Sequence, residues 1–183
     1  MNGVKFAKVA RFKDVDFEMP VRKTAKSAGY DMVVAEDIII PPYNKQMAII
    51  DQELYQRDEW KAYWSLDEMA NVTKTTKAKP SLVSTGVKCY LPEGYYLKLA
   101  IRSSCPLKYW LVLANSEGVI DADYADNPDN EGEIFFQIIN FSPVPIKLHK
   151  GDIIGQGIIL PFETTEDDNA TGARIGGMGS TSV

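Results

Sequence analysis

The sequence predicts an all-β domain, a sandwich or barrel of many short strands. Apolar and polar residues alternate over 87–91 and 95–101, so one face of each strand is expected in a core. Residues 134–141 are rich in β-branched and aromatic types, and 153–162 form a further apolar stretch. Turn-forming residues separate these runs, at 41–42, 92–94, 127–130, 143–145 and 150–152.

One region, residues 51–79, departs from this β pattern. Trp60, Tyr63 and Trp64 recur at helical spacing, and residues 65–68 have the form of a capping box. We therefore expect a helical insertion over 51–79, with a polar connector leading back to the sheet. Such an aromatic stripe usually packs on its own domain or a neighbouring subunit rather than binding a cofactor.

The C-terminal residues 163–183 are expected to form a flexible tail. Residues 163–171 are polar and acidic, and a glycine-rich run follows that contains Arg174, Ser180 and Thr181. Glycines leave backbone N–H groups free to approach phosphate oxygens, and the Arg, Ser and Thr side chains add donors. A phosphate clasp that orders on binding and a disordered glycine-rich terminus are both compatible with this composition.

Length and composition narrow the function. The 183 residues fit a single domain over 1–183. A net charge of −5 argues against a nucleic-acid partner, but not against a nucleotide bound with a metal ion. Cys89 and Cys105 form no CxxC pair, so both are expected to be reduced core residues rather than zinc ligands. We find no apolar signal core and no run of membrane-spanning length, so we expect a soluble cytoplasmic protein without a membrane partner.

The densest chemical signal is the segment 118–124, Gly-Val-Ile-Asp-Ala-Asp-Tyr. If the strand continues through it, alternation places Asp121 and Asp123 on one face. A carboxylate fixed there can orient and deprotonate a water molecule, and Tyr124 can pack flat against a ring-shaped substrate. A hairpin tip with solvated acids is the alternative, because Asp is common in turns.

Three further clusters accompany this hairpin: Ser-Ala-Gly-Tyr-Asp-Met at 27–32, Arg-Ser-Ser at 102–104, and Gly-Asp-Ile-Ile-Gly-Gln at 151–156. Each alone is a modest turn motif. Together with the hairpin and the glycine-rich tail, and in this order, they make the chain resemble the homotrimeric dUTP diphosphatase (dUTPase) family. The five motifs cover the chain apart from its insertions.

The resemblance implies a β jelly roll, a barrel or sandwich that assembles as a homotrimer. Each active site would be shared by three subunits, with the tail of one closing over a pocket made by two others. The reaction would be Mg²⁺-dependent hydrolysis of dUTP to dUMP and pyrophosphate, by attack of water on the α-phosphorus. It would limit incorporation of uracil into DNA and supply dUMP for dTMP synthesis. Phosphoryl transfer of this kind depends on positioned water and charge neutralisation.

By the same resemblance, the hairpin would bind the nucleoside. Asp121 would be the general base and would also contact the sugar 3′-hydroxyl, while Tyr124 would pack under the deoxyribose. Asn115, with Gly118 and Ile120, would help the hairpin to read uracil.

The remaining motifs would bind metal and phosphates. Asp31 would hold Mg²⁺ through water. The residues that would bind phosphates are Arg102, Ser103, Ser104, Gln156, Arg174, Ser180 and Thr181, with Met178 covering the base.

Several of these residues have simpler alternatives. Arg102 can pair with an acid at a subunit interface, and Asp31 and Asp152 can hold turns. Asp123 can support the hairpin without reacting, and His149 is expected on the surface.

The chain departs from the family pattern at several points. Met178 stands where an aromatic is usual, and Arg174 is one residue too close to the glycine pair that follows it. An acidic loop, residues 125–131, intervenes before Gly132 and could modulate access or metal binding. Position 153 is Ile where a basic residue is common. The insertion over 51–79 has no counterpart in the minimal pattern.

Two other functions are considered. A dCTP deaminase shares the fold and an Arg-Ser-Ser motif, but its proton-shuttling glutamate is matched here by Gln137, which cannot accept and return a proton. A dUTPase-like protein with an added signalling role would bind a protein partner, for which the 51–79 insertion is the candidate surface.

Overall fold

The computed structural model describes residues 3–43, 80–172, 174 and 176, and the expected insertion at 51–79 lies outside this range. Eleven strands are present in the described part. They are β1 (Lys5–Lys8), β2 (Gly29–Val33), β3 (Ile38–Ile40), β4 (Ser81–Ser84), β5 (Val87–Tyr90), β6 (Tyr95–Ile101), β7 (Leu111–Leu113), β8 (Gly118–Ile120), β9 (Phe135–Asn140), β10 (Ile146–Leu148) and β11 (Ile153–Pro161). Short helical segments are η1 (Ala10–Phe12), α3 (Ser104–Tyr109) and η3 (Ala122–Tyr124).

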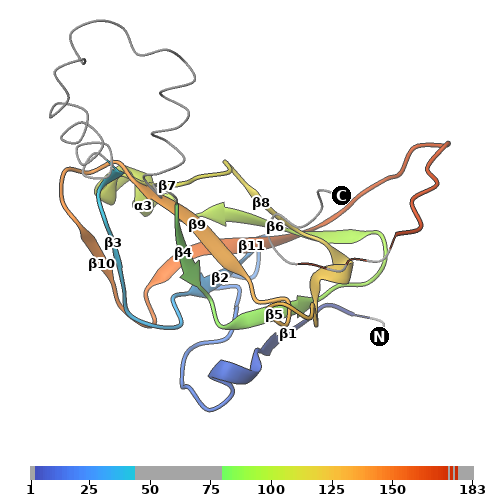
Figure 1. The fold of residues 1–183 in the computed structure, drawn as a ribbon, viewed down its shortest axis with the longest axis horizontal. Coiled ribbons are helices and arrows are strands. Elements are labelled where there is room, and N and C mark those ends of the chain that lie inside the picture. Colours follow the sequence, from blue (N-terminus) through green and yellow to red (C-terminus); the bar gives the residue numbers. More distant parts are fainter. Residues whose placement is uncertain (1–2, 44–79, 173, 175, 177–183) are drawn as a thin grey trace, which may run out of the picture.

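The strands pair antiparallel in four small sheets (Figure 1). A four-stranded sheet has the order β2-β11-β6-β8, and a three-stranded sheet has the order β4-β9-β7. The pairs β1-β5 and β10-β3 complete the set. One buried cluster contains Leu97, Leu99 and Ile154 of the first sheet together with Phe136 and Ile138 of the second. The two sheets therefore pack face to face around a common core.

The predicted all-β class is confirmed, and the strands expected from 87–91, 95–101, 134–141 and 153–162 appear as β5, β6, β9 and β11. Both cysteines are buried and unpaired, as expected. His149 is an exposed residue beside Asp37, again as expected. Among the described residues there is no helix with the length and apolar character needed to span a membrane.

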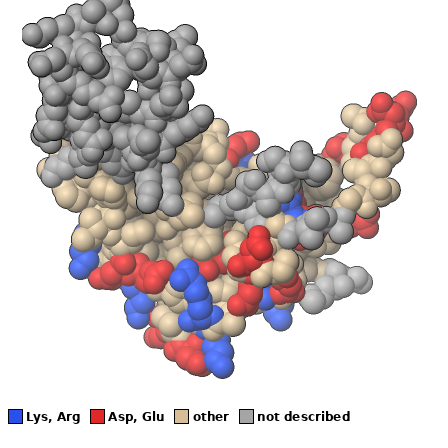
Figure 2. Space-filling view, in the orientation of Figure 1, with Lys and Arg blue, Asp and Glu red and all other residues tan. Residues whose placement is uncertain are grey.

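Residues 163–172 project from the body as an exposed arm (Figure 1), and Figure 2 shows acidic side chains at its far end. The hydrogen bonds of residues 165–170 are internal, from Asp168 N to Thr165 O and from Ala170 N to the Asp168 carboxylate. Phe162 anchors the base of the arm, because its backbone N–H donates to Gly94 O and its ring meets Tyr96.

An ion pair whose acid is buried joins the N-terminal segment to the residues that precede β9. Arg11 donates from Nε and Nη2 to the two carboxylate oxygens of Glu133, at 3.0 and 2.8 Å, and the Ser84 hydroxyl donates to the same carboxylate. The Glu133 side chain is only 4% exposed. The hydrogen bond to Glu133 raises the pKa of Arg11 above its usual value. Because an unpaired carboxylate is costly to bury, this contact fixes the position of Glu133.

We expect Arg11→Met to lower the free energy of unfolding by about 2 kcal/mol, because it leaves the Glu133 carboxylate buried without its cation. Lys23→Met is the matched control, since Lys23 and its partner Glu18 are both about half exposed, and it should change stability by no more than about 0.5 kcal/mol. Urea unfolding measures both. Equal effects of the two variants would show that burial of Glu133 contributes nothing.

A second expectation concerns Cys89, whose burial raises the pKa of its thiol to about 12. The pKa of a thiol in the unfolded chain is about 8.5, so above that pH the unfolded chain releases a proton that the native state keeps. The stabilisation is complete below about pH 8.5 and falls as the pH rises toward the folded pKa. Wild type should lose about 2 kcal/mol more than Cys89→Ala between pH 8 and pH 10 in urea unfolding. Parallel pH profiles for the two proteins would contradict this.

Candidate active site

The predicted site residues gather in two places on the four-stranded sheet. We call Asp31, Arg102, Ser103 and Gln156 the strand-end cluster, because they lie where β6 ends and β11 begins. We call Asp121, Asp123, Tyr124 and Arg174 the hairpin cluster, because the first three residues follow β8 and Arg174 donates hydrogen bonds to both aspartates.

The register of β11 builds the strand-end cluster. Gln156 lies directly opposite Asp31 of β2 on one side and Ala100 of β6 on the other. Asp31, Ile101, Arg102, Ser103, Gly155 and Gln156 line a pocket of about 300 Å³. A carboxylate, a hydroxyl, a carboxamide and a guanidinium therefore border one open space.

The turn after β6 presents Arg102 and Ser103. The backbone N–H of Arg102 donates to Ile154 O at 3.1 Å, and that of Cys105 donates to Arg102 O at 2.9 Å. The Ser103 hydroxyl makes no capping hydrogen bond to α3, so it is free to meet a ligand. Within the described chain the Arg102 guanidinium has no acidic partner, so the alternative of an ion pair requires a residue from elsewhere.

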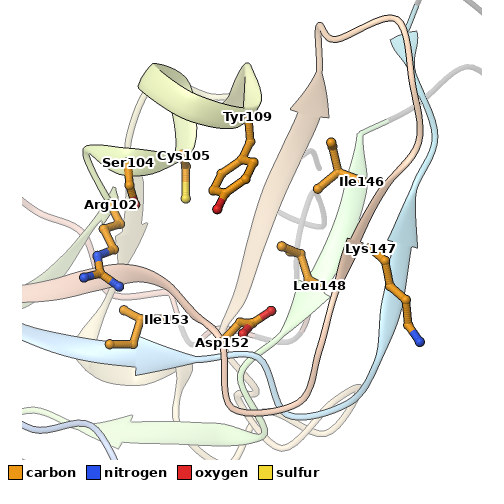
Figure 3. A pocket seen from close by; sticks show the side chains of 9 residues that line it. All are labelled: Arg102, Ser104, Cys105, Tyr109, Ile146, Lys147, Leu148, Asp152 and Ile153. Carbon is orange, nitrogen blue, oxygen red and sulfur yellow. The ribbon is translucent and has the colours of Figure 1, made fainter.

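Arg102 also borders a second pocket, of about 230 Å³, between α3 and β10 (Figure 3). Ser104 lines this pocket and not the strand-end pocket, so the structure separates it from Ser103. Asp152 lines it too and accepts a hydrogen bond from His149 N at 2.8 Å. Asp152 thus holds its turn, as its residue type allows.

The β7–β8 hairpin carries the predicted uracil-reading residues. Its tip is closed by a hydrogen bond from Glu117 N to Asn115 O and fixed to β9 by one from Ala114 N to Gln137 O, at 2.6 and 2.7 Å. An ion pair between Lys98 and Glu117 ties the tip to β6. At Gly118, a Cβ would lie 2.9 Å from Leu99 Cδ1, so the glycine allows close packing of β8 on β6. The hairpin is therefore rigidly placed.

Asp121 and Asp123 follow β8, but not as a continuing strand. Asp121 keeps an extended backbone and precedes η3, so the expected strand alternation through Asp123 is wrong. The two carboxylates nevertheless converge, because Arg174 donates from Nε to Asp123 Oδ1 at 2.8 Å and from Nη2 to Asp121 Oδ2. The hydrogen bond to Asp123 is the main cause of a raised pKa of Arg174, and the charge of Asp121 and its hydrogen bond add to it.

Tyr124 is a buried part of the hairpin cluster, with 5% of its surface exposed. Its hydroxyl donates to Glu133 O at 3.2 Å and accepts from Asn130 Nδ2 at 2.8 Å. Burial raises the pKa of Tyr124, so the phenol stays protonated near neutral pH. The guanidinium of Arg174 lies 5.7 Å from the ring centroid. The contact between this ring and a deoxyribose stays a prediction.

The loop 125–131 braces Tyr124, a role that the sequence did not suggest. Asp126 accepts hydrogen bonds from Lys88 and from Tyr90 Oη, and the Glu131 carboxylate accepts from Ala10 N at 3.1 Å. The loop turns back at Gly132, whose φ is +76°. The contacts of the loop to β5 and to residue 10 could not be read from its own composition.

Across residues 3–43 and 80–172, no group of three or more His, Cys, Asp and Glu side chains is arranged to hold a metal.

The two clusters of one chain do not form one pocket. The pocket at the hairpin is lined by Glu93, Gly94, Asp121, Ala122, Asp123, Phe162 and Arg174, and it shares no residue with the strand-end pocket. Ile120 pairs with Leu97 near the start of β6, whereas Gly155 pairs with Ile101 at its end. The four residue steps from Leu97 to Ile101 along β6 cover roughly 13 Å, and Asp121 lies beyond that span.

Comparison with known proteins identifies the family. The dUTPase family model matches residues 15–65 and 64–182. The deoxyuridine 5′-triphosphate nucleotidohydrolase of Lactococcus lactis subsp. lactis (strain IL1403) is 34% identical over 178 residues, which cover 96% of this chain and 95% of that protein. The enzyme of the same name from Wolinella succinogenes is 28% identical over 170 residues, covering 89% of this chain and 85% of that protein.

Solved structures agree. The crystal structure of dUTPase from Streptococcus mutans matches with a TM-score of 0.64 at 33% identity, over 88% of this chain and 98% of that one. The dUTPase from phage phi11 of S. aureus has the same fold at 19% identity, with a TM-score of 0.59 over 92% of this chain and 96% of that one. The jelly-roll fold expected from the sequence is confirmed, and the chain belongs to the dUTPase family.

Proposed function

We propose that this protein hydrolyses dUTP to dUMP and pyrophosphate, with Mg²⁺, by directing a water molecule at the α-phosphorus. Its relatives are named deoxyuridine 5′-triphosphate nucleotidohydrolases, which supports this substrate. The observation that carries the proposal is the placement of Asp121, whose carboxylate is held at the end of β8 and is 49% exposed. We propose the cytoplasm as its place of action, because two reduced, buried cysteines suit a reducing compartment.

Asp121 is the proposed general base. A half-exposed carboxylate on a rigid strand end can receive a proton from a water molecule beside it. In this structure Arg174 occupies one oxygen of that carboxylate. The negative charge of a triphosphate would therefore compete with Asp121 for the guanidinium of Arg174.

The strand-end cluster is the proposed phosphate and metal site. Its donor set fits Mg²⁺, which keeps several waters and is bound through one or two carboxylates together with substrate phosphates. Asp31 is the carboxylate of the strand-end pocket, and Ser103 and Gln156 border the same space. When bound, the metal neutralises phosphate charge. Ser103, Gln156 and Arg102 orient the phosphate chain by donating hydrogen bonds.

The hairpin is the proposed reader of uracil. Asn115, Gly118 and Ile120 lie on a backbone that the Lys98–Glu117 pair and the hydrogen bond to Gln137 hold in place. A backbone fixed this closely would clash with the methyl group of thymine and would fail to match the amino group of cytosine.

We further propose a homotrimer in which each site combines two or more chains. Because the two clusters of one chain line separate pockets, the strand-end cluster of one copy would meet the hairpin cluster of another. The tail would close this shared site, with Arg174 and with Met178, Ser180 and Thr181, which lie outside the described residues.

The first test of this function is pyrophosphate release from dUTP, dTTP, dCTP and UTP with Mg²⁺. Only dUTP should be hydrolysed efficiently, and EDTA should abolish the reaction. Asp121→Asn should lower kcat by about 10²–10⁴-fold, the usual contribution of a general base. Asp14→Asn, a change at an exposed surface acid, is the control and should leave kcat unchanged. Ammonia release from dCTP would instead identify a deaminase, and full activity of Asp121→Asn would remove the proposed base.

The second test asks whether sites are shared between chains. Asp121→Asn and Ser103→Ala are each expected to be nearly inactive alone. Mixed trimers, refolded from equal amounts of both, should recover activity in about a quarter of their sites, because a hairpin from one variant then meets a strand-end cluster from the other. Size-exclusion chromatography with light scattering checks the trimer. Mixtures no more active than the parents would place both clusters of a working site in one chain.

A further inference from the structure

Gly29 occupies a position where backbone geometry does not call for glycine. It is buried at the start of β2, and its φ lies outside the left-handed region that Gly86, Gly94, Gly132 and Gly151 adopt. Glycine weakens a strand because it loses more backbone entropy on folding and offers no side chain to pack. A requirement for space is the remaining reason for a glycine here.

The space above Gly29 is filled by the side chain of Gln156. A Cβ on residue 29 would lie 2.0 Å from Gln156 Oε1 and 2.7 Å from its Cδ. Strand register explains this contact. Ile158 lies opposite Gly29 and Gln156 opposite Asp31, so Gln156 is the diagonal neighbour of Gly29 on the same face of the sheet. The carboxamide therefore leans along the sheet over the bare Cα of Gly29, beside Asp31.

We infer that Gly29 is a positioning residue, whose missing Cβ forms the slot that holds the Gln156 carboxamide at the floor of the strand-end pocket. This inference rests on the proposed function, in which that carboxamide donates to a phosphate group. A methyl group at position 29 would push the carboxamide out of the slot, into the space bordered by Asp31 and Ser103. The donor would then be displaced and the space for phosphate reduced.

The nature of the clash separates this role from a structural one. The two nearest atoms, Oε1 and Cδ of Gln156, belong to the far end of a flexible side chain and can rotate away from an alanine. The third, Gln156 Cβ at 3.0 Å, then needs to give way only slightly. At Gly155, on the same strand, a Cβ would meet Phe136 Cε1 at 2.3 Å and Ala100 O at 2.6 Å. Those neighbours lie in the packed core and the backbone and cannot rotate away, so alanine at 155 should destabilise the fold.

The experiment is a double-mutant cycle on dUTP hydrolysis with Gly29→Ala, Gln156→Ala and the two combined. Gly29→Ala and Gln156→Ala should each lower kcat/KM by about tenfold. The loss should come from the same constant, kcat or KM, in both variants. Because alanine at position 156 has no carboxamide for the slot to hold, kcat/KM of the combined variant should match that of Gln156→Ala within about twofold. Gly3→Ala is the control, since Gly3 lies outside the proposed site and no atom lies within 4 Å of its Cβ position.

Two further measurements do not depend on turnover. The melting temperature of Gly29→Ala should stay within about 3 °C of wild type, whereas Gly155→Ala should melt clearly lower. In ¹⁵N-correlated NMR spectra, the side-chain amide signal of Gln156, identified by its loss in Gln156→Ala, should shift in Gly29→Ala and stay in place in Gly3→Ala.

The outcomes separate this inference from the proposed function. A wild-type protein that does not hydrolyse dUTP overturns the proposed function, and with it the role of the slot in phosphate binding. An unmoved Gln156 amide signal in Gly29→Ala overturns the slot itself, even if wild type is fully active. Multiplicative losses in the combined variant would likewise show that the two residues act independently.

Discussion

The antiparallel register of β11 against β2 and β6 is the constraint on which the site depends. It sets Gln156 opposite Asp31, brings Ile101 to Gly155, and so brings the end of β6, with Arg102 and Ser103, to the same pocket. A slip of one residue would turn Gln156 to the opposite face of the sheet and separate it from Asp31. Close packing maintains this register, because the glycines of β11 admit Phe136 and Leu97 against its backbone.

The other end of the sheet is held by a relay of contacts that starts far away in sequence. Arg11 and Ser84 hold the Glu133 carboxylate, the Glu133 carbonyl accepts from Tyr124, and Asn130 donates to the same phenol. The loop 125–131 is itself tied to β5 through Asp126 and Lys88. The buried Glu133 carboxylate and the Tyr124 hydroxyl are thus matched with partners, as a rigid site requires, whereas Asn127 Nδ2 of the same loop is buried without one. Asp121 owes its fixed position to this support as much as to β8.

The negative charge of the two hairpin aspartates is only partly neutralised within the chain. Asp121 and Asp123 share one guanidinium, that of Arg174, which is 17% exposed and also lies near the Tyr124 ring. A guanidinium that already donates to two carboxylates keeps only its remaining N–H groups for a phosphate group. The tail and the substrate therefore compete for the same interactions, and the strength of the Asp123–Arg174 hydrogen bond becomes part of the energetics of substrate binding.

The resemblance of five ordered motifs to the dUTPase family singled out Asp31, Arg102, Ser103, Asp121 and Gln156 as candidate site residues, and their roles stay predictions. Local pattern in the sequence was enough to determine the β class, the strands at β5, β6, β9 and β11, and the burial of Cys89 and Cys105. These follow from periodicity and residue type, which act over a few neighbouring residues. Only the tertiary structure decided the turn into η3 after Asp121, the pairing of Arg174 with both acids, the burial of Glu133 against Arg11, and the slot that Gly29 leaves for Gln156. Those contacts join residues far apart in the chain, and register and packing across strands, rather than any local pattern, determine which of them meet.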